Sequence, residues 1–342
     1  MKFEKHSLCH IPFCYAVGAM PVGGRQTYFF ATDDTGPCYA VDAQTLARET
    51  VWDGPGGTMS IVPLPNEPDA FLASQNFMPG FAAAHARIVK VKRTPSGWTV
   101  TSWLKLPYVH RFDLLQRDGR WYFLACILSS TQEEHARRDC PGYLAAAPMS
   151  ADFAPPAHLE VIARGMARNH GYCRVAREGY DQAYTACDQG VFRVTPPAAP
   201  GENWTVEQLL KQAASDVAVC DVDGDGQEEL AVIHPFHGDV FAVYHRKGHG
   251  YTPCYCYPKP APFLHAIWGG TLRGKPVFLA GCRAGDKDFF LVEHTPSGLR
   301  ARLIETGAGP SNVTVLPGPD HDTILIANRE SHEAAVFTVT EG

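Results

Sequence analysis

The chain has 342 residues, of which 45% are hydrophobic and 19% are charged, and its formal net charge is −6. This length suits two ordinary domains or one large closed β-domain. A negative net charge without a basic block argues against binding to a nucleic-acid backbone or to an anionic membrane surface. We therefore expect neither a nucleic-acid partner nor a membrane partner, and the composition leaves the oligomeric state open.

The cysteines and the N-terminal residues predict a cytoplasmic protein. The eleven cysteines are scattered singly. The closest pairs lack zinc-knuckle spacing, and an odd total does not suit a secreted disulfide framework. Pro12 interrupts the first apolar run, which lacks a small-residue cleavage site. Because no apolar segment reaches about 18 residues, no transmembrane helix is expected.

Going along the chain, seven short segments share one pattern, a polar residue followed by an alternating apolar strand. Their starting residues are 46 to 60 positions apart, which is the spacing of four-stranded propeller blades. The segments begin at His10 (HIPFCYAV), Thr58 (TMSIVPLP), His110 (HRFDLLQR), His170 (HGYCRVAR), Asp216 (DVAVCDVD), His265 (HAIWGGTL) and Asn312 (NVTVLPGP).

Each starting segment is followed by further short strands. The second strand ends in a small residue and a polar cluster, as in YFLACILSS, and a third and a fourth precede the next segment. Turn sequences such as TPSG and RDGR separate them. The alternation of β-branched and aromatic residues favours strands over helices. A short helix at 207–214 is an alternative to the fourth strand of one blade.

The last repeat stops after its third strand, AAVFTVT. Residues 2–8 come before the first repeat, where an outer strand belongs, so we expect them to complete the seventh blade and close the ring. Closure removes the exposed sheet edges of an open array. The prediction is an all-β fold, one seven-bladed β-propeller domain spanning residues 1–342. A two-domain β-sandwich is the alternative.

The first strand of each propeller blade lines the central channel, so the seven starting residues should form a ring at one mouth. Loops after the second strands open nearby, and they should add side chains to the same mouth. These are Gln75, Ser129, Asp188, His234, His237, Arg283, Asn328 and Arg329. One histidine at a strand start is ordinary, whereas four in one column of the repeat point to a function, because buried imidazoles need partners.

Neutral imidazoles that converge with carboxylates suit a divalent transition metal such as Mn, Fe, Ni or Zn. With one position open, such a metal polarises a carbonyl or hydroxyl group. A remaining histidine or Tyr172 then serves as general acid or base. Arginines at the mouth would hold a carboxylate by paired hydrogen bonds; the candidates are Arg111, Arg283 and Arg329. Trp268, Phe77 and Tyr108 are candidates for stacking on a sugar ring.

A separate motif, DVDGDGQEEL, spans residues 221–230. Its acidic residues resemble the first half of a calcium loop, but Val232 replaces the final glutamate of an EF-hand. We expect a polar turn between the first two strands of a blade. Its role is structural, with or without Ca²⁺ bound by Asp221, Asp223, Asp225 and Glu229.

These motifs resemble the propeller part of aldos-2-ulose dehydratase and related FG-GAP-type propeller sugar lyases. The resemblance rests on HRFDLL, NHGYCRV, PFHGDVFAVY, LHAIWGG and DVDGDGQEEL. It implies a metal-assisted lyase acting on a sugar, and it selects His110, His170, His237 and His265 as site residues. His234 has no such support and is expected behind the cluster.

The resulting hypothesis is a carbon–oxygen lyase, a dehydratase or β-eliminase, acting on a small sugar, keto-sugar or uronide. Its metal ligands would be His237, His265 and His170. The catalytic groups would be His110, His170, Tyr172 and Arg111, and the substrate-binding residues Arg329, Asn312, Gln75 and Trp268. Two alternatives remain open. One is a non-catalytic binding propeller, and the other is a glycoside hydrolase, which needs two facing carboxyl groups.

Overall fold

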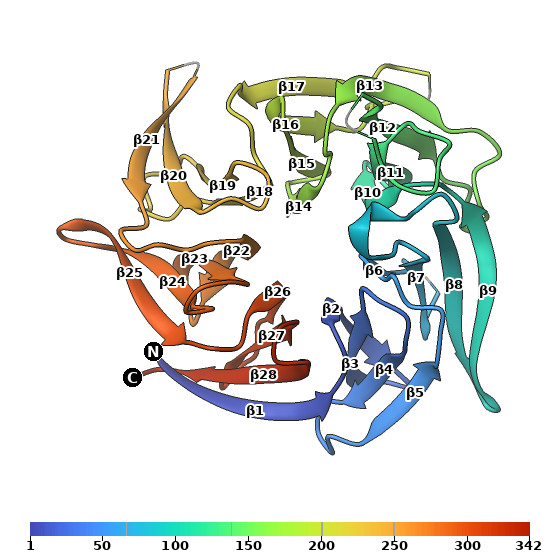
Figure 1. Cartoon of the computed structure of the whole chain (residues 1–342), viewed down its shortest axis with the longest axis horizontal. Coiled ribbons are helices and arrows are strands. Elements are labelled where there is room, and N and C mark those ends of the chain that lie inside the picture. Colours follow the sequence, from blue (N-terminus) through green and yellow to red (C-terminus); the bar gives the residue numbers. More distant parts are fainter. Residues whose placement is uncertain (66, 138, 200, 249) are drawn as a thin grey trace.

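The computed structural model describes residues 1–65, 67–137, 139–199, 201–248 and 250–342. Seven sheets of four antiparallel strands surround a central channel (Figure 1). The predicted seven-bladed β-propeller is thus confirmed. The one helical segment in this part of the chain is the 3₁₀ turn η1 (Pro79–Phe81). No helix there is both long enough and apolar enough to cross a bilayer.

The blades follow one another along the chain. Blade 1 contains β2 (Cys14–Val22), β3 (Arg25–Thr32), β4 (Cys38–Asp42) and β5 (Arg48–Trp52). Blade 2 contains β6 (Ile61–Pro63), β7 (Ala70–Gln75), β8 (Arg87–Thr94) and β9 (Gly97–Lys105). Blade 3 contains β10 (Val109–Arg117), β11 (Arg120–Ser129), β12 (Pro141–Pro148) and β13 (Glu160–Met166). Blade 4 contains β14 (Gly171–Ala176), β15 (Asp181–Cys187), β16 (Gly190–Thr195) and β17 (Thr205–Leu210).

The remaining blades have the same order. Blade 5 contains β18 (Asp216–Cys220), β19 (Glu229–His234), β20 (Val240–Lys247) and β21 (Gly250–Cys256). Blade 6 contains β22 (Leu264–Leu272), β23 (Lys275–Cys282), β24 (Phe289–Thr295) and β25 (Gly298–Glu305). Blade 7 contains β26 (Pro310–Leu316), β27 (Asp322–Asn328), β28 (Glu333–Thr340) and β1 (Lys2–His10). Residues 205–210 therefore form a strand, as the blade pattern favoured, and not the alternative helix.

The N-terminal strand closes the ring. β1 pairs with β28 from Lys2↔Thr340 to His10↔Glu333, as predicted. In Figure 1 this strand runs along the outer edge of blade 7. His10 is therefore at the end of an outer strand, where its ring contacts His332, and not at the channel. Its predicted place in the channel ring is wrong, because the innermost strand of blade 1 begins four residues later.

The entry to each innermost strand explains how single side chains reach the mouth. In six blades a residue with left-handed φ precedes the strand: Phe13, Gly57, Tyr108, Arg168, Phe263 and Gly309, with φ between 49° and 68°. In four of these blades the pairing of the first two strands then skips one residue, a β-bulge. The skipped residues are Tyr15, His110, His265 and Ser311. In these six blades the repeat thus presents one residue at the mouth, two positions after the left-handed residue.

Candidate metal centre in the mouth cavity

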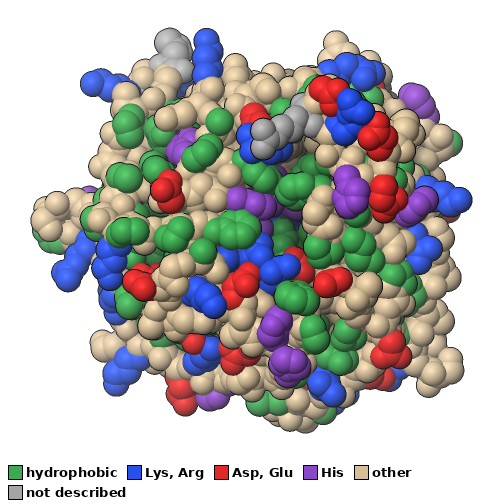
Figure 2. Space-filling view, in the orientation of Figure 1, with side chains coloured by type: hydrophobic (Ala, Val, Ile, Leu, Met, Phe, Trp, Pro, Cys, Tyr) green, Lys and Arg blue, Asp and Glu red, His purple; other side chains and the backbone are tan. Residues whose placement is uncertain are grey.

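A cavity of about 240 Å³ opens at the mouth of the channel. It is lined by Tyr15, Asp33, Met59, Phe77, Met78, Pro79, Gly80, Phe81, His110, His170, His237, Phe263, His265, Arg283 and Arg329. Figure 2 shows histidine side chains at the centre of this face, where the surface is hollowed. The cavity combines the bulge residues of the innermost strands with the loops that follow the second strands.

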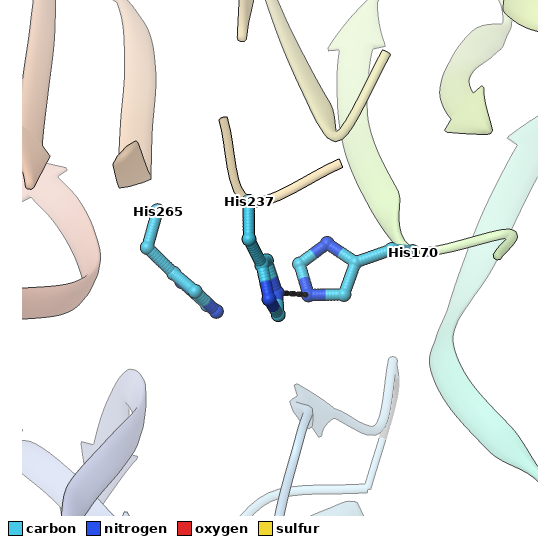
Figure 3. A group of neighbouring side chains, drawn as sticks. All are labelled: His170, His237 and His265. Atoms are coloured by element: carbon cyan, nitrogen blue, oxygen red, sulfur yellow. Dashed lines mark hydrogen bonds between the residues drawn. The ribbon is translucent and has the colours of Figure 1, made fainter. Parts of the chain in front are cut away.

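Three imidazoles converge in this cavity, from three consecutive blades (Figure 3). His170 immediately precedes β14, His237 follows β19, and His265 is the bulge residue of β22. One ring nitrogen of each lies within 4.8 Å of the others. His170 and His265 are almost fully buried, with 1% and 3% of their surface exposed. Carboxylates, which were expected in the ring, are not among these three ligand candidates.

The neighbouring blade fixes the orientation of each strand-borne histidine. His170 Nδ1 lies 3.2 Å from the Ser215 carbonyl oxygen. His265 Nδ1 lies 2.7 Å from the Ser311 carbonyl oxygen. Since a carbonyl oxygen only accepts, Nδ1 carries the proton in both rings. Their Nε2 lone pairs are therefore available in the cavity. Metal-binding histidines are oriented in this way by hydrogen bonds from the other ring nitrogen.

The third imidazole comes from a tight turn. His237 has φ 49°, and its backbone N–H donates to Ser215 Oγ at 3.1 Å. The next residue must be glycine, because a Cβ on Gly238 would lie 2.1 Å from the His234 carbonyl oxygen. This turn is the FHG motif of the sequence.

The spacing of these nitrogens fits a metal ion. The Nε2 atoms of His237 and His170 are 3.3 Å apart. Two imidazole nitrogens at about 2.1 Å from one tetrahedral zinc ion would be about 3.4 Å apart. Without a metal, the same contact is an N–H···N hydrogen bond in which His237 donates. The donor set, three imidazoles and no carboxylate, suits Zn²⁺, Ni²⁺ or Fe²⁺ better than Ca²⁺ or Mg²⁺.

Burial keeps these imidazoles neutral. Desolvation lowers the pKa of His237 to about 3, and the charges of Arg283 and Arg168 act in the same direction. The pKa values of His170 and His265 are well below the usual 6.5, again chiefly because of burial. Metal ligation requires the neutral form, so the three rings are ready to bind at neutral pH without losing a proton.

A fourth imidazole lies beside the cluster. The ring of His110 is 4.2 Å from that of His170 and packs against Phe77 at 5.0 Å. Its Nδ1 donates to the His170 carbonyl oxygen at 3.0 Å, so its Nε2 is also unprotonated. Burial, together with Arg111, lowers the pKa of His110 well below its usual value. His110 is therefore a neutral base next to the three candidate ligands.

The opposite wall of the cavity is cationic and held by ion pairs. Arg329 Nε donates to Asp33 Oδ2 at 2.6 Å, and Arg283 donates to Glu330 at 2.9 Å while lying 4.4 Å over the ring of Phe263. Burial, together with the charge of Arg329, lowers the pKa of Arg283. Burial raises the pKa of Asp33. Two guanidinium groups side by side favour an anionic or strongly polarised oxygen of a ligand.

Tyr15 completes this wall, although the sequence did not single it out. Its hydroxyl lies 3.3 Å from His265 Nε2, and burial raises the pKa of Tyr15 to about 12. The hydroxyl is therefore protonated at neutral pH and can donate a hydrogen bond. Aligning PFCYAV of blade 1 with PFLHAIW of blade 6 would have identified Tyr15 as the counterpart of His265.

Several residues predicted at the mouth instead line a second cavity, of about 690 Å³, farther along the channel. They are Arg111, Tyr172, Asn312, Asp216 and Trp268. The counterparts of His110 and His265 in blades 5 and 7 are Ser215 and Ser311, one residue before the positions chosen from the sequence. A shift by one residue reverses the direction of a strand side chain.

The polar groups of this lower cavity bind one another. Arg111 donates to the Met59 carbonyl oxygen and, at 2.8 Å, to Asn312 Oδ1. The Tyr172 hydroxyl donates to Asp113 at 3.2 Å. Tyr172 therefore lies outside the histidine cavity, and its predicted role as acid or base is not supported by its position.

Five further predicted residues do not line the mouth cavity: Gln75, Thr58, Tyr108, Ser129 and Asn328. Gln75 is buried at the end of β7, where its Oε1 accepts from Arg87 at 3.1 Å, and it does not line the mouth cavity. Thr58 is buried, and its neighbour Met59 lines the cavity instead. Tyr108 is completely buried in the core. Its hydroxyl donates to the Glu133 carbonyl oxygen, which leaves the ring unavailable for stacking on a sugar.

Two further predictions concern residues outside the three ligand candidates. His234 lies behind the cluster as expected, between the Ala213 carbonyl oxygen at 2.6 Å and the Tyr244 hydroxyl at 3.0 Å. Phe77 lines the cavity, where a ligand could contact it. The eleven cysteines are all free.

The acidic motif forms the turn between β18 and β19, as predicted. Asp221 accepts from the backbone N–H groups of Gly224 at 2.8 Å and Gly226 at 3.0 Å. Asp223 accepts from the N–H of Asp225, and Glu229 binds His245 at 2.8 Å. Two overlapping groups of possible cation ligands occur here, both including Asp223.

Comparisons with known proteins support the fold. No protein-family model and no curated protein matches the chain. Sqt1 from Saccharomyces cerevisiae has a TM-score of 0.58 at 8% identity, over 98% of each chain. A proposed 6-phosphogluconolactonase from Bacteroides uniformis has a TM-score of 0.56 at 12% identity, over 86% of this chain and 85% of that one. One from Bacteroides fragilis has the same score and identity, over 92% and 87%. At such identities the likeness shows the propeller architecture alone, and the resemblance to aldos-2-ulose dehydratase stays a prediction.

Proposed function

We propose that this protein is a metal-assisted carbon–oxygen lyase that acts on a small keto-sugar or uronide. The observation that carries the proposal is the convergence of three neutral imidazoles, His170, His237 and His265, within 4.8 Å of one another beside a fourth, His110. A divalent Mn, Fe, Ni or Zn ion held there would stabilise negative charge developing on a substrate carbonyl oxygen.

The residues around the cluster supply the other requirements of an elimination. His110 Nε2 accepts the proton from the carbon next to the carbonyl group, because it is unprotonated and not among the three ligand candidates. The bond from the following carbon to the leaving oxygen then breaks, and that oxygen departs with the electron pair. Return of the proton from His110 to the leaving oxygen gives an enone and water or an alcohol.

The cationic wall would position the substrate. Arg283 and Arg329 can donate to the carboxylate of a uronide or to the hydroxyl oxygens of a keto-sugar, and the Tyr15 hydroxyl can donate to the same oxygens. Asp33 is the one carboxylate among the described residues that line the cavity, and it is already bound to Arg329. The facing pair of carboxyl groups that a glycoside hydrolase needs is thus missing from this lining, which disfavours that alternative.

The test loads purified protein, made without a histidine tag, with Mn²⁺, Fe²⁺, Ni²⁺ or Zn²⁺ in turn. Each form is incubated with keto-glucosides and with uronides, and ultraviolet absorbance follows the enone product. We expect a new absorbance band with at least one metal and one substrate class, which a chelator abolishes. Absence of product in every combination would overturn the lyase, and a chelator-insensitive product would overturn the role of the metal.

Lactone hydrolysis is the second candidate. A ligand set of three histidines without a carboxylate is also found where a metal activates water, as in carbonic anhydrase. Two structural neighbours are described as proposed 6-phosphogluconolactonases, which makes sugar lactones the natural substrates to try. Acid release from gluconolactone in a pH-stat, without any enone from the keto-sugars, would favour this function over the lyase.

A further inference from the structure

A third cavity adjoins the metal cluster at the mouth face. It measures about 470 Å³ and lies beside the histidine cavity, between blades 3 and 4. Phe81 lines both cavities, so its ring stands at their boundary. Phe236 lines the third cavity and stacks on His237, with ring centroids 4.0 Å apart. We call this space the side lobe.

The walls of the side lobe are aromatic and aliphatic, with two cations, Arg137 and Arg168, and Arg137 is already paired with Glu133 and Asp139. Leu128, Pro141 and Ala167 contribute apolar surface, together with the two phenylalanine rings. Arg168 lies 4.8 Å over the ring of Phe236 and donates to Asp188 Oδ2 at 2.8 Å. The second oxygen, Asp188 Oδ1, is buried and has no hydrogen-bond partner in the described part of the chain. An apolar lining with a few placed polar groups is typical of a ligand pocket.

The boundary between the two cavities is held in an unusual conformation. Phe81 has φ 59°, which is rare for a residue with a bulky side chain. Its carbonyl oxygen accepts from the N–H of Ala136, another lining residue of the side lobe, at 3.0 Å. Its ring packs 5.9 Å from that of Phe236. Strained residues of this kind cluster at ligand-binding sites, where the surrounding structure holds them.

We propose that the side lobe binds an aromatic leaving group, so that the substrate is an aryl glycoside of a keto-sugar and not a free sugar. This inference rests on the proposed lyase function. The histidine cavity, at about 240 Å³, is below the roughly 300–1,000 Å³ that ordinary ligand pockets occupy, whereas the two cavities together fall within it. Phe81 and Phe236 offer ring faces and edges to an aromatic group.

The chemistry of departure fits this assignment. When the proton on the carbon next to the carbonyl moves to His110, the carbon–oxygen bond breaks and its electron pair leaves on the phenolic oxygen. The phenolate then takes one proton, so that one keto-glycoside gives one enone and one phenol. The guanidinium of Arg168 lies at the lobe beside Phe236, where it would stabilise the phenolate.

The test compares two substrates that undergo the same reaction, the 3-keto derivatives of phenyl and methyl β-glucoside. Ala167→Trp fills the side lobe from the connection between β13 and β14, and Ala136→Trp fills it from the connection between β11 and β12. Ala157→Trp, on an exposed position of blade 3, is the matched control. We expect each filling variant to lower kcat/KM for the phenyl substrate at least tenfold, to leave the methyl substrate within twofold, and to keep the wild-type metal content. Equal losses on both substrates, or no loss on either, would overturn the inference.

A second readout is independent of turnover. Saturation-transfer NMR with unreacted phenyl β-glucoside reports whether its ring protons contact the protein. We expect a signal with the wild type and with Ala157→Trp, and none with the filling variants. If this pattern holds but neither keto-glucoside reacts, the side lobe is an aromatic-binding site and the proposed lyase function is wrong. A ring-proton signal that persists in both filling variants would contradict binding of the aromatic group in the side lobe, whether or not the keto-glucosides react.

Discussion

Two groups of potential metal ligands lie at opposite ends of this propeller, and they differ in what their ligand atoms already bind. In the acidic turn, Asp221 and Asp223 accept hydrogen bonds from backbone N–H groups of the same turn. In the mouth cluster, the backbone binds the Nδ1 side of His170 and His265, which leaves Nε2 for a ligand. The carboxylates of the turn are bonded to its own backbone, whereas the Nε2 atoms of the cluster make contacts of 3.3 Å, between His237 and His170 and between His265 and the Tyr15 hydroxyl.

This difference shows why residue type alone is a poor guide to a metal site. The acidic turn has the more familiar sequence, but its carboxylates are partly exposed and already hydrogen-bonded. The histidines are spread over almost a hundred residues, and they meet because three blades deliver them to one mouth. Substitutions in the two groups should therefore differ in the size of their effects.

Removing a cluster imidazole should have the largest effect. We expect His237→Ala to lose most of its bound transition metal and to lower kcat/KM by more than about 100-fold, since even the partners that orient ligands contribute 10–100-fold. Elemental analysis and the enone assay measure both quantities. Asp223→Ala, from the acidic turn, serves as the control and should retain metal and activity. If the His237→Ala variant still bound one metal ion per chain, His237 would not be a metal ligand.

The second prediction separates the base from the ligands. We expect His110→Ala to keep its metal while losing about 10²–10⁴-fold in kcat, the usual contribution of a general base. The comparison with His237→Ala uses the same two measurements. Loss of metal in His110→Ala would instead make His110 a fourth ligand and would leave the proton transfer without a base.

The third prediction concerns a buried carboxyl that belongs to neither group. Burial raises the pKa of Asp216 to about 7, opposed by the charge of Arg111. The folded state therefore holds this proton more tightly than the unfolded state does. The stability that it contributes is fully present below about pH 4 and is lost as the pH rises to about 7.

We expect Asp216→Asn to remove this pH dependence, because the amide oxygen can still accept from the N–H groups of Val217 and Tyr172. At pH 8 the variant should be more stable than the wild type by on the order of 2 kcal/mol. Urea unfolding of both proteins at pH 5 and pH 8 measures the effect. Parallel pH profiles for the two proteins would contradict it.

The smallest effects are expected in the acidic turn. Asp223→Ala, or calcium removal with a chelator, should change the free energy of unfolding by less than about 1 kcal/mol. The hydrogen bond to Glu229 raises the pKa of His245, so the stability of this pair is present at low pH and is lost as the pH rises through that raised pKa. His245→Gln should therefore be more harmful at pH 5.5 than at pH 8.5 in thermal unfolding. A large stabilisation by Ca²⁺ would show that the turn is a true cation site.

The sequence was sufficient for the architecture, because the repeat of short alternating strands is local and regular. It also identified His110, His170 and His265, which occupy equivalent positions in their blades. It misplaced His10, which ends an outer strand, and Asp216 and Asn312, which follow the equivalent position by one residue. For Asn312 the cause is a β-bulge, which shifts the register by one residue and which nothing in the alternation marks. Asp216 is misplaced without a bulge, because the alternation does not mark which residue at the strand entry faces the mouth, and His10 because the innermost strand of blade 1 begins four residues later.

The cavity boundaries were beyond the reach of the sequence. Phe81 and Phe236 belong to loops of different blades, and their contact depends on how the connection after β7 meets the short turn after β19. The separation of Arg111 from the mouth depends on its bonds to Met59 and Asn312, which are distant in the sequence. Long-range contacts of this kind follow from the closed ring and have no local signature.

The hydrogen bonds from each histidine to the next blade also limit how this site could be transplanted. His265 belongs to blade 6, but its Nδ1–H donates to the Ser311 carbonyl oxygen of blade 7. A graft of β22 alone into another propeller would carry the imidazole without the group that fixes its tautomer. The smallest portable unit is the histidine strand together with the first strand of the following blade, so protein engineers should move such sites as pairs of neighbours.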